Sequence, residues 1–110
     1  MEIKCTIQFK TQTAHGSGDG VVLFENGEFV VRNKGIATRM LFGALGAALA
    51  KGKEVMRFPV SEISSYETFR KMLANYMRFT LKDGSVLLFN YSKNVEEELL
   101  AIVSSVPHSV

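Results

Sequence analysis

The sequence predicts a mainly β domain in which about six or seven antiparallel strands precede one C-terminal amphipathic helix. Three observations support this fold class: an alternating segment opens the chain, two later segments have the pattern of a β-hairpin, and the last segment has a helical period. At 110 residues the chain predicts a single domain, residues 1–110. That length is sufficient for one core without disulfides or metals.

Residues 2–10 predict a strand with one buried face, because polar residues alternate there with Ile3, Cys5, Ile7 and Phe9. The same alternation leaves no apolar core for a signal peptide, so we expect no leader. The glycine-rich stretch AHGSGDG that follows, residues 14–20, predicts a flexible loop.

Two hairpins are predicted from turn residues placed between β-rich runs. Asn26-Gly27 lies between 21–25 and 28–32, and this pair is typical of type I′ turns because both residues must have positive φ. Asp83-Gly84 lies in the same way between strands expected at about 76–82 and 85–91. We therefore expect a primed turn at both places and an antiparallel sheet.

The middle segment allows two interpretations. A strand near 55–58, a break at Pro59 and a strand from about 62 to 69 form one of them. The other is a helix over about 65–76, where apolar residues also recur at helical spacing. We favour the strand-turn-strand interpretation, because the next strand must start by about Tyr76 to pair across Asp83-Gly84.

The C-terminal segment predicts an amphipathic helix. Asn94 is a suitable N-cap, and the three glutamates 96–98 would lie where the helix dipole favours negative charge. One apolar stripe follows, and Pro107 marks the end of the helix. The stripe consists of Leu99, Ile102, Val103 and Val106.

This order of elements resembles the pleckstrin-homology superfold, and more closely the small bacterial PH-like and GRAM-like domains. The resemblance rests on GVVLFENGEFVVR, on FPVSEISSYE, and on FTLKDGSVLLF followed by NVEEELLAIVSSV. It covers about residues 20–106, with the strand at 2–10 as an added or permuted strand. The resemblance implies a split barrel and a role as a binding module, although this fold hosts many unrelated functions.

Residue types that carry chemistry are sparse. His15 and His108 have no partners at zinc-ligand spacing, and GSGDG lacks the lysine and hydroxyl of a P-loop. The aromatic residues fall on strands that need a core, and the RNP motif is absent. We therefore expect no enzyme, no cofactor, no metal and no nucleic-acid partner. The single cysteine, Cys5, excludes an internal disulfide and fits a cytoplasmic protein.

The segment RMLFGALGAALAKGK, residues 39–53, is the strongest candidate for a contact surface. Eleven apolar or small residues, 40–50, predict a short helix or loop at about 39–51, too short for the roughly 20 residues of a membrane-spanning helix. Five bases and no acid lie between Glu28 and Glu54. A helix would place its bulky residues on one side and its Ala and Gly residues on the other.

Three interpretations of this segment remain open. The bulky side can cover the domain's own sheet, which is favoured on energy alone because it has no association cost. The small side can pack against a second copy, or the bulky side can enter a lipid interface while the bases hold anionic headgroups. An exposed apolar patch of this size often marks an interface.

Our functional hypothesis is a non-catalytic binding module of unknown ligand that self-associates through 39–53, as a homo-oligomer or with an unknown protein partner. The alternative is a peripheral module that contacts anionic membrane headgroups through the same segment. The predicted contact residues are Arg39, Leu41, Phe42, Leu45, Leu49, Lys51 and Lys53.

Overall fold

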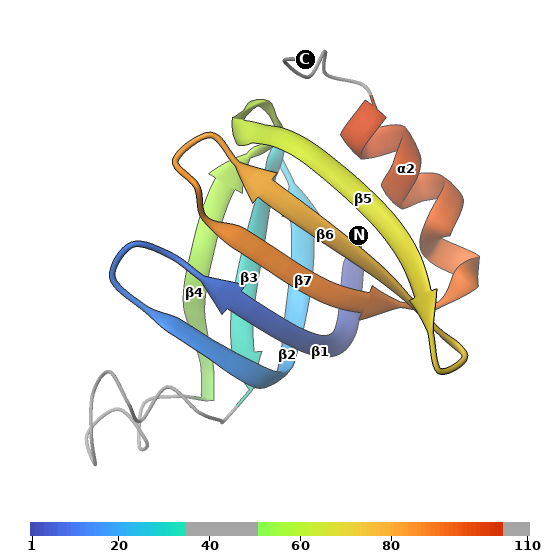
Figure 1. The fold of residues 1–110 in the computed structure, drawn as a ribbon, viewed down its shortest axis with the longest axis horizontal. Helices are drawn as coiled ribbons and strands as arrows, with labels where there is room; N and C mark the ends of the chain where they lie inside the picture. The colour runs from blue at the N-terminus through green and yellow to red at the C-terminus, as the bar shows by residue number, and fades with distance from the viewer. Residues whose placement is uncertain (35–50, 105–110) are drawn as a thin grey trace.

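The computed structural model describes residues 1–34 and 51–104 of the chain. Within them, seven strands form one antiparallel sheet in the order β4-β3-β2-β1-β7-β6-β5, which curls into a half-barrel (Figure 1). The predicted mainly β antiparallel class is therefore confirmed. The strands are β1 (Glu2–Lys10), β2 (His15–Glu25), β3 (Glu28–Lys34), β4 (Lys51–Pro59), β5 (Ile63–Lys71), β6 (Ala74–Leu81) and β7 (Val86–Tyr91).

The strand β1 lies in the middle of the sheet. It pairs with β2 along its whole length and with β7 from Ile7 to Lys10. The alternation in its sequence becomes an alternation of faces, with Ile7 and Phe9 buried while Gln8 and Lys10 are exposed. In Figure 1 the strands β2 to β4 and the strands β1 and β5 to β7 run in different directions, so that the inner faces enclose the core.

The prediction of a loop at 14–20 is wrong, because β2 begins at His15. The glycines there let neighbouring backbone and rings approach. A methyl group on Gly16 would lie 3.1 Å from the ring of Phe9. One on Gly20 would lie 2.7 Å from the carbonyl oxygen of Arg32 and 2.8 Å from Cδ1 of Ile7. The glycines thus serve close strand packing instead of flexibility.

The two predicted hairpins form, but only one has the predicted turn. Asn26 and Gly27 have φ of 54° and 78°, as a type I′ turn requires. At the second hairpin Gly84 has a φ of 90° while Asp83 has no positive φ, so the primed turn predicted there is wrong. The backbone N–H of Gly84 donates to the Leu81 carbonyl at 2.9 Å, and that of Leu81 to the Ser85 carbonyl at 2.8 Å. This is a three-residue loop with glycine in the left-handed position.

Strand-turn-strand is confirmed in the middle segment, and the alternative helix over 65–76 is wrong. A 3₁₀ turn, Val60–Glu62, follows Pro59, and β5 then pairs with β6 up to Lys71 opposite Ala74. Met72 and Leu73 form the two-residue tip between them, with φ of 51° and 68°. Large side chains rarely adopt this conformation.

The terminal helix is confirmed as α2 (Glu96–Ser104), preceded by a 3₁₀ turn at Lys93–Val95. Asn94 lies inside this turn, and Ser92 is the N-cap of the turn, so the prediction of Asn94 as the helix cap is wrong. Leu99 and Val103 are fully buried in the core cluster, as the predicted stripe requires. Val106, Pro107 and His108 lie outside the described residues.

The core is dominated by aromatic rings from four strands. Phe29 packs against Phe58 and Phe79, with ring centroids 5.6 and 5.1 Å apart, and Phe79 meets Phe89 edge-on at 5.5 Å. Because these rings fill the inner face, apolar residues on the opposite face of the same strands are not part of the core.

We expect Gly20→Ala to lower the free energy of unfolding by about 1–3 kcal/mol, since the added methyl group meets backbone that cannot yield cheaply. Urea unfolding would measure the change. Ser17→Ala, on an exposed position of the same strand, is the control and should stay within about 0.5 kcal/mol of the parent. Equal effects of the two changes would contradict the packing role of Gly20.

We expect the double change Met72→Asn/Leu73→Gly to raise the free energy of unfolding by about 1–2 kcal/mol, because Asn-Gly adopts both left-handed positions with little strain. The chain already uses this pair at 26–27. The same urea titration measures the gain. A loss of stability would show that the apolar tip packs better than its exposure indicates.

Candidate functional site

The segment that the sequence predicts as a contact surface lies outside the described side chains. Only the backbone of Lys51 and Lys53 is described, at the start of β4 opposite Lys34 and Asn33. Nothing in the structure therefore tests the predicted contact residues. They are Arg39, Leu41, Phe42, Leu45, Leu49, Lys51 and Lys53.

The described residues contain a different candidate surface on the outer face of the sheet. Two hollows of about 590 and 400 Å³ adjoin each other there, and Gln8, Ser17 and Leu88 line both. We call them together the outer-face groove. The remaining lining residues are Phe9, Lys10, His15, Gly16, Arg78 and Val86 in the first hollow, and Thr6, Ile7, Phe69, Lys71, Met72 and Tyr76 in the second.

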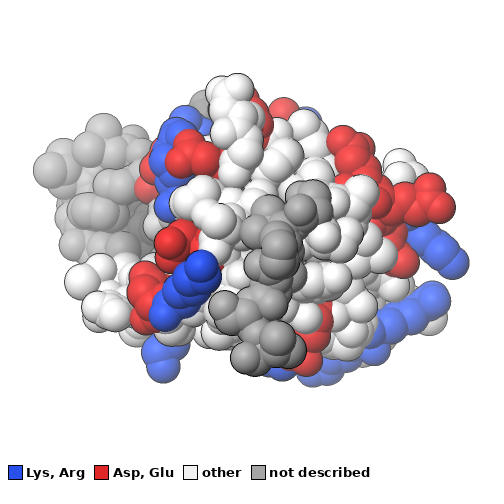
Figure 2. Space-filling model, turned by 90° about the horizontal axis from the view of Figure 1, so that it is seen from above, with Lys and Arg blue, Asp and Glu red and all other residues white. Residues whose placement is uncertain are grey.

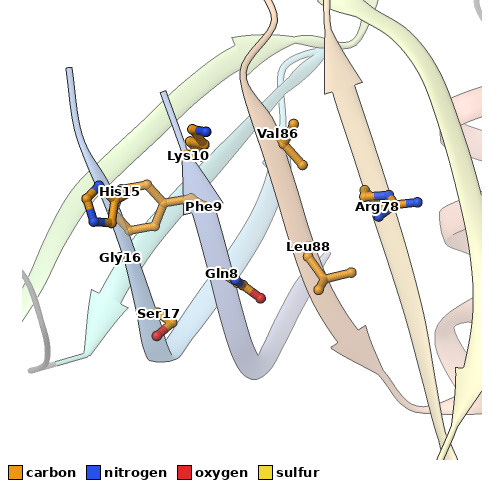
Figure 3. Close-up of a pocket in the computed structure, with 9 residues that line it drawn as sticks. All are labelled: Gln8, Phe9, Lys10, His15, Gly16, Ser17, Arg78, Val86 and Leu88. Carbon is orange, nitrogen blue, oxygen red and sulfur yellow. The ribbon is translucent and has the colours of Figure 1, made fainter. Parts of the chain in front are cut away.

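Strand register brings these side chains together from distant parts of the sequence. Gln8 lies opposite both Ser17 on β2 and Leu88 on β7, and Leu88 lies opposite Arg78 on β6. Figure 3 shows this row of side chains from four neighbouring strands, with Lys10 and Val86 above it in the view, further along β1 and β7. Antiparallel partners stand only about 5 Å apart, so the row acts as one surface.

The floor of the groove is more apolar than an ordinary solvated strand face. Val86 and Leu88 are half-buried on the outer face of β7, while Leu87 and Phe89 fill the inner face. The sequence VLLF carries a signal that could have identified this, because a strand with one wet face should alternate. The prediction from the sequence places a strand here and no groove.

An aromatic pair forms the end of the groove near the β5–β6 tip. The rings of Phe69 and Tyr76 stack with centroids 5.4 Å apart and an interplanar angle of 12°. The guanidinium of Arg78 lies 5.9 Å from the centroid of Phe69 and also pairs with Glu67. Met72 extends this apolar end to the tip, where its side chain is 89% exposed.

The charges that line the outer-face groove have one sign. Among its described lining residues, Lys10, Lys71 and Arg78 are basic, and no Asp or Glu is present. The nearest acids in register are Glu67, opposite Arg78, and Asp19, opposite Thr6. Elsewhere the signs mix, and Figure 2 shows acidic and basic side chains close together around the face seen from above.

Groups with displaced pKa values have structural causes outside this groove. Burial raises the pKa of the Cys5 thiol to about 12, although a backbone hydrogen bond with Val22 opposes the shift. The hydrogen bond from Arg57 lowers the pKa of Glu54, and the backbone N–H of Ser85 lowers that of Asp83. Burial, followed by the charge of Glu96, raises the pKa of the Tyr91 hydroxyl. We find no nucleophile activated by these shifts.

Metal binding and membrane spanning are two further functions on which the described residues bear. In residues 1–34 and 51–104, no group of three or more His, Cys, Asp or Glu side chains is placed to hold a metal ion. Among the same residues, no helix is long and apolar enough to cross a membrane.

The fold has a counterpart among solved structures. The chain is similar to the pleckstrin homology (PH) domain of USP37, with a TM-score of 0.62 and 19% identity over 96% of this chain and 98% of that one. No family model and no curated protein matches the sequence. The likeness shows a PH-like fold. Because it covers nearly the whole chain, β1 belongs to the shared fold and is not the added strand that the sequence analysis expected.

We expect the Cys5 thiol of the folded protein to react with iodoacetamide at pH 8 about a thousandfold more slowly than in the unfolded chain. Raising the pKa from 9.0 to about 12 lowers the reactive thiolate fraction by that factor. Mass spectrometry of the alkylated protein, with and without denaturant, gives the two rates. Similar rates would contradict the burial of this thiol.

Proposed function

We propose that this chain is a non-catalytic binding module. The observation that carries the proposal is the outer-face groove, in which half-buried apolar side chains and a stacked aromatic pair collect on a face that a solvated sheet keeps polar. An exposed apolar patch on a small domain is typical of an interaction surface. The PH-like fold is compatible with this role but does not select it, since one fold hosts many functions.

The chemistry of the groove supports binding over catalysis. Its titratable side chains are bases, one tyrosine and His15, with no lining carboxylate to act beside them. Cys5 is half-buried and does not line the groove, and burial keeps its thiol protonated. A nucleophile paired with a base, the arrangement that hydrolytic and transfer enzymes use, does not occur among these lining residues.

We further propose that the module self-associates through residues 39–53. The support is the sequence, with its apolar run and small residues, together with the position of the flanking strands. Pairing of β3 with β4 ends at Lys34 opposite Lys51, and β4 is an edge strand of the sheet. In sequence the segment leads directly into this edge strand, and exposed sheet edges are where other chains can pair.

Contact with anionic lipid through the same segment is the alternative. In that arrangement Arg39, Lys51 and Lys53 would hold headgroups while Leu41 and Phe42 insert. Each base is worth about 1 kcal/mol near an anionic leaflet, and each buried large apolar side chain about 1.5–3 kcal/mol. These contributions are large enough to give reversible binding after the entropy cost of ordering the segment is subtracted.

Sedimentation velocity over a wide concentration range tests self-association. We expect the parent protein to form a larger species as concentration rises, and Leu45→Glu to remain a folded monomer because a charge in the interface loses its solvation. Thr13→Glu, on the exposed β1–β2 loop, is the matched control and should associate like the parent. A parent protein that stays monomeric, with Leu45→Glu unfolded, would show that the segment covers its own domain.

Co-sedimentation with vesicles distinguishes membrane contact from self-association. Binding that requires anionic lipid, weakens with salt and is lost in Lys51→Glu/Lys53→Glu would replace self-association by membrane contact. A chain that neither associates nor binds vesicles, and that binds no peptide in the experiment described below, would contradict the binding module itself.

A further inference from the structure

We propose that the outer-face groove, together with the β5–β6 tip, docks an extended acidic segment of a partner protein whose apolar side chains alternate with its carboxylates. The inference rests on the proposed binding module and assigns it a ligand class. It is independent of residues 39–53.

The apolar contacts of the proposed ligand are concentrated at the tip. Phe69, Met72 and Leu73 are the exposed large hydrophobic side chains of the described residues, and all three belong to the β5–β6 hairpin. Met72 lines the same hollow as Tyr76 and Leu88, so this apolar surface continues from the tip into the groove. Such a surface can receive several apolar side chains of one ligand.

The backbone of the tip indicates that its side chains are not there for the fold. Met72 and Leu73 occupy two left-handed positions, which are sterically unfavourable for L residues with large side chains. Their side chains are 89% and 86% exposed, so little packing offsets that cost. Local strain that folding does not require is typical of functional positions.

The charges select an acidic partner. Lys10 and Lys71 lie in different hollows of the groove, and Arg78 lies beside the Phe69–Tyr76 pair. With no lining carboxylate, the groove presents only positive charge to a ligand, apart from the pairing of Arg78 with Glu67. Complementary charges guide encounter and fix orientation, and like charges are rejected.

The shape favours an extended chain over a lipid surface. One row of side chains crosses five strands from Ser17 to Glu67, and four strand spacings of about 4.8 Å give about 19 Å. An extended peptide of about six residues covers that length. Leu88 lines both hollows of the groove, and a narrow chain can enter hollows that a planar bilayer cannot follow.

The test uses an array of octapeptides in which Glu alternates with Leu or Phe. Two matched arrays replace every Glu by Lys, or every Leu and Phe by Ser. We expect the parent protein to bind the acidic-apolar peptides at least tenfold more tightly than either matched set, because the groove needs both the charge and the apolar side chains. Fluorescence polarisation with the best peptides gives the affinities.

Two variants locate the site. Met72→Asn/Leu73→Gly should keep or gain stability while peptide binding weakens at least tenfold. The loss of binding then cannot be attributed to unfolding. Lys10→Glu/Lys71→Glu should weaken binding similarly. Lys82→Glu/Lys93→Glu makes the same change of charge at exposed positions outside the groove and should bind like the parent.

Three outcomes would overturn the inference: equal binding to all three arrays, binding that both groove variants retain, or absence of peptide binding. Vesicles of phosphatidylserine and phosphatidylcholine are tested in parallel. If they bind in a way that the groove variants abolish while peptides do not bind, the surface meets lipid instead. In that case, or if self-association alone is found, the binding module stands and the acidic ligand is wrong.

Discussion

The pairing of β1 with β2 on one side and β7 on the other is the constraint on which both the core and the groove depend. Side chains alternate along β1, so a slip of one residue would turn Gln8 into the core and Ile7 into solvent. Backbone pairing with β7 covers only Ile7 to Lys10, and the N–H of Thr6 instead donates to the side chain of Asn90 at 2.7 Å. On the β2 side, the lack of a side chain at Gly20 lets β1 and β3 approach without displacement.

Once that register is set, the filled inner face determines what the outer face can do. The aromatic rings of β3, β4, β6 and β7 already close the core, so Val86 and Leu88 have no place inside it. They add apolar area on the solvent-exposed face, where it contributes little to the stability of the fold. The side chains of the groove are therefore not needed to complete the core. For this reason, substitutions in the groove can weaken binding without lowering the stability of the fold.

Local signals in the sequence predict most of the fold. Asn26-Gly27, the alternation of 2–10 and the terminal apolar stripe each depend on neighbours in the chain, and the elements that they predict form. The loop expected at 14–20 fails because composition cannot show that Gly16 faces a ring from another strand. The groove was missed for the same reason, since Gln8 and Leu88 meet only through register. The predicted contact segment 39–53 was found by composition alone, and its role stays a proposal.

Two turns in residues 1–34 and 51–104 have positive φ at both central residues, and comparing them joins fold to function. Asn26 and Gly27 adopt the left-handed region at little cost. Met72 and Leu73 adopt the same region although it is unfavourable for their side chains. What holds them is the hairpin below: pairing continues to Lys71 opposite Ala74, Phe69 stacks on Tyr76, and Arg78 pairs with Glu67. These contacts also line or border the groove. The contacts that hold the strained tip are thus the same contacts that shape the surface beside it, so a change in this hairpin affects tip and groove together.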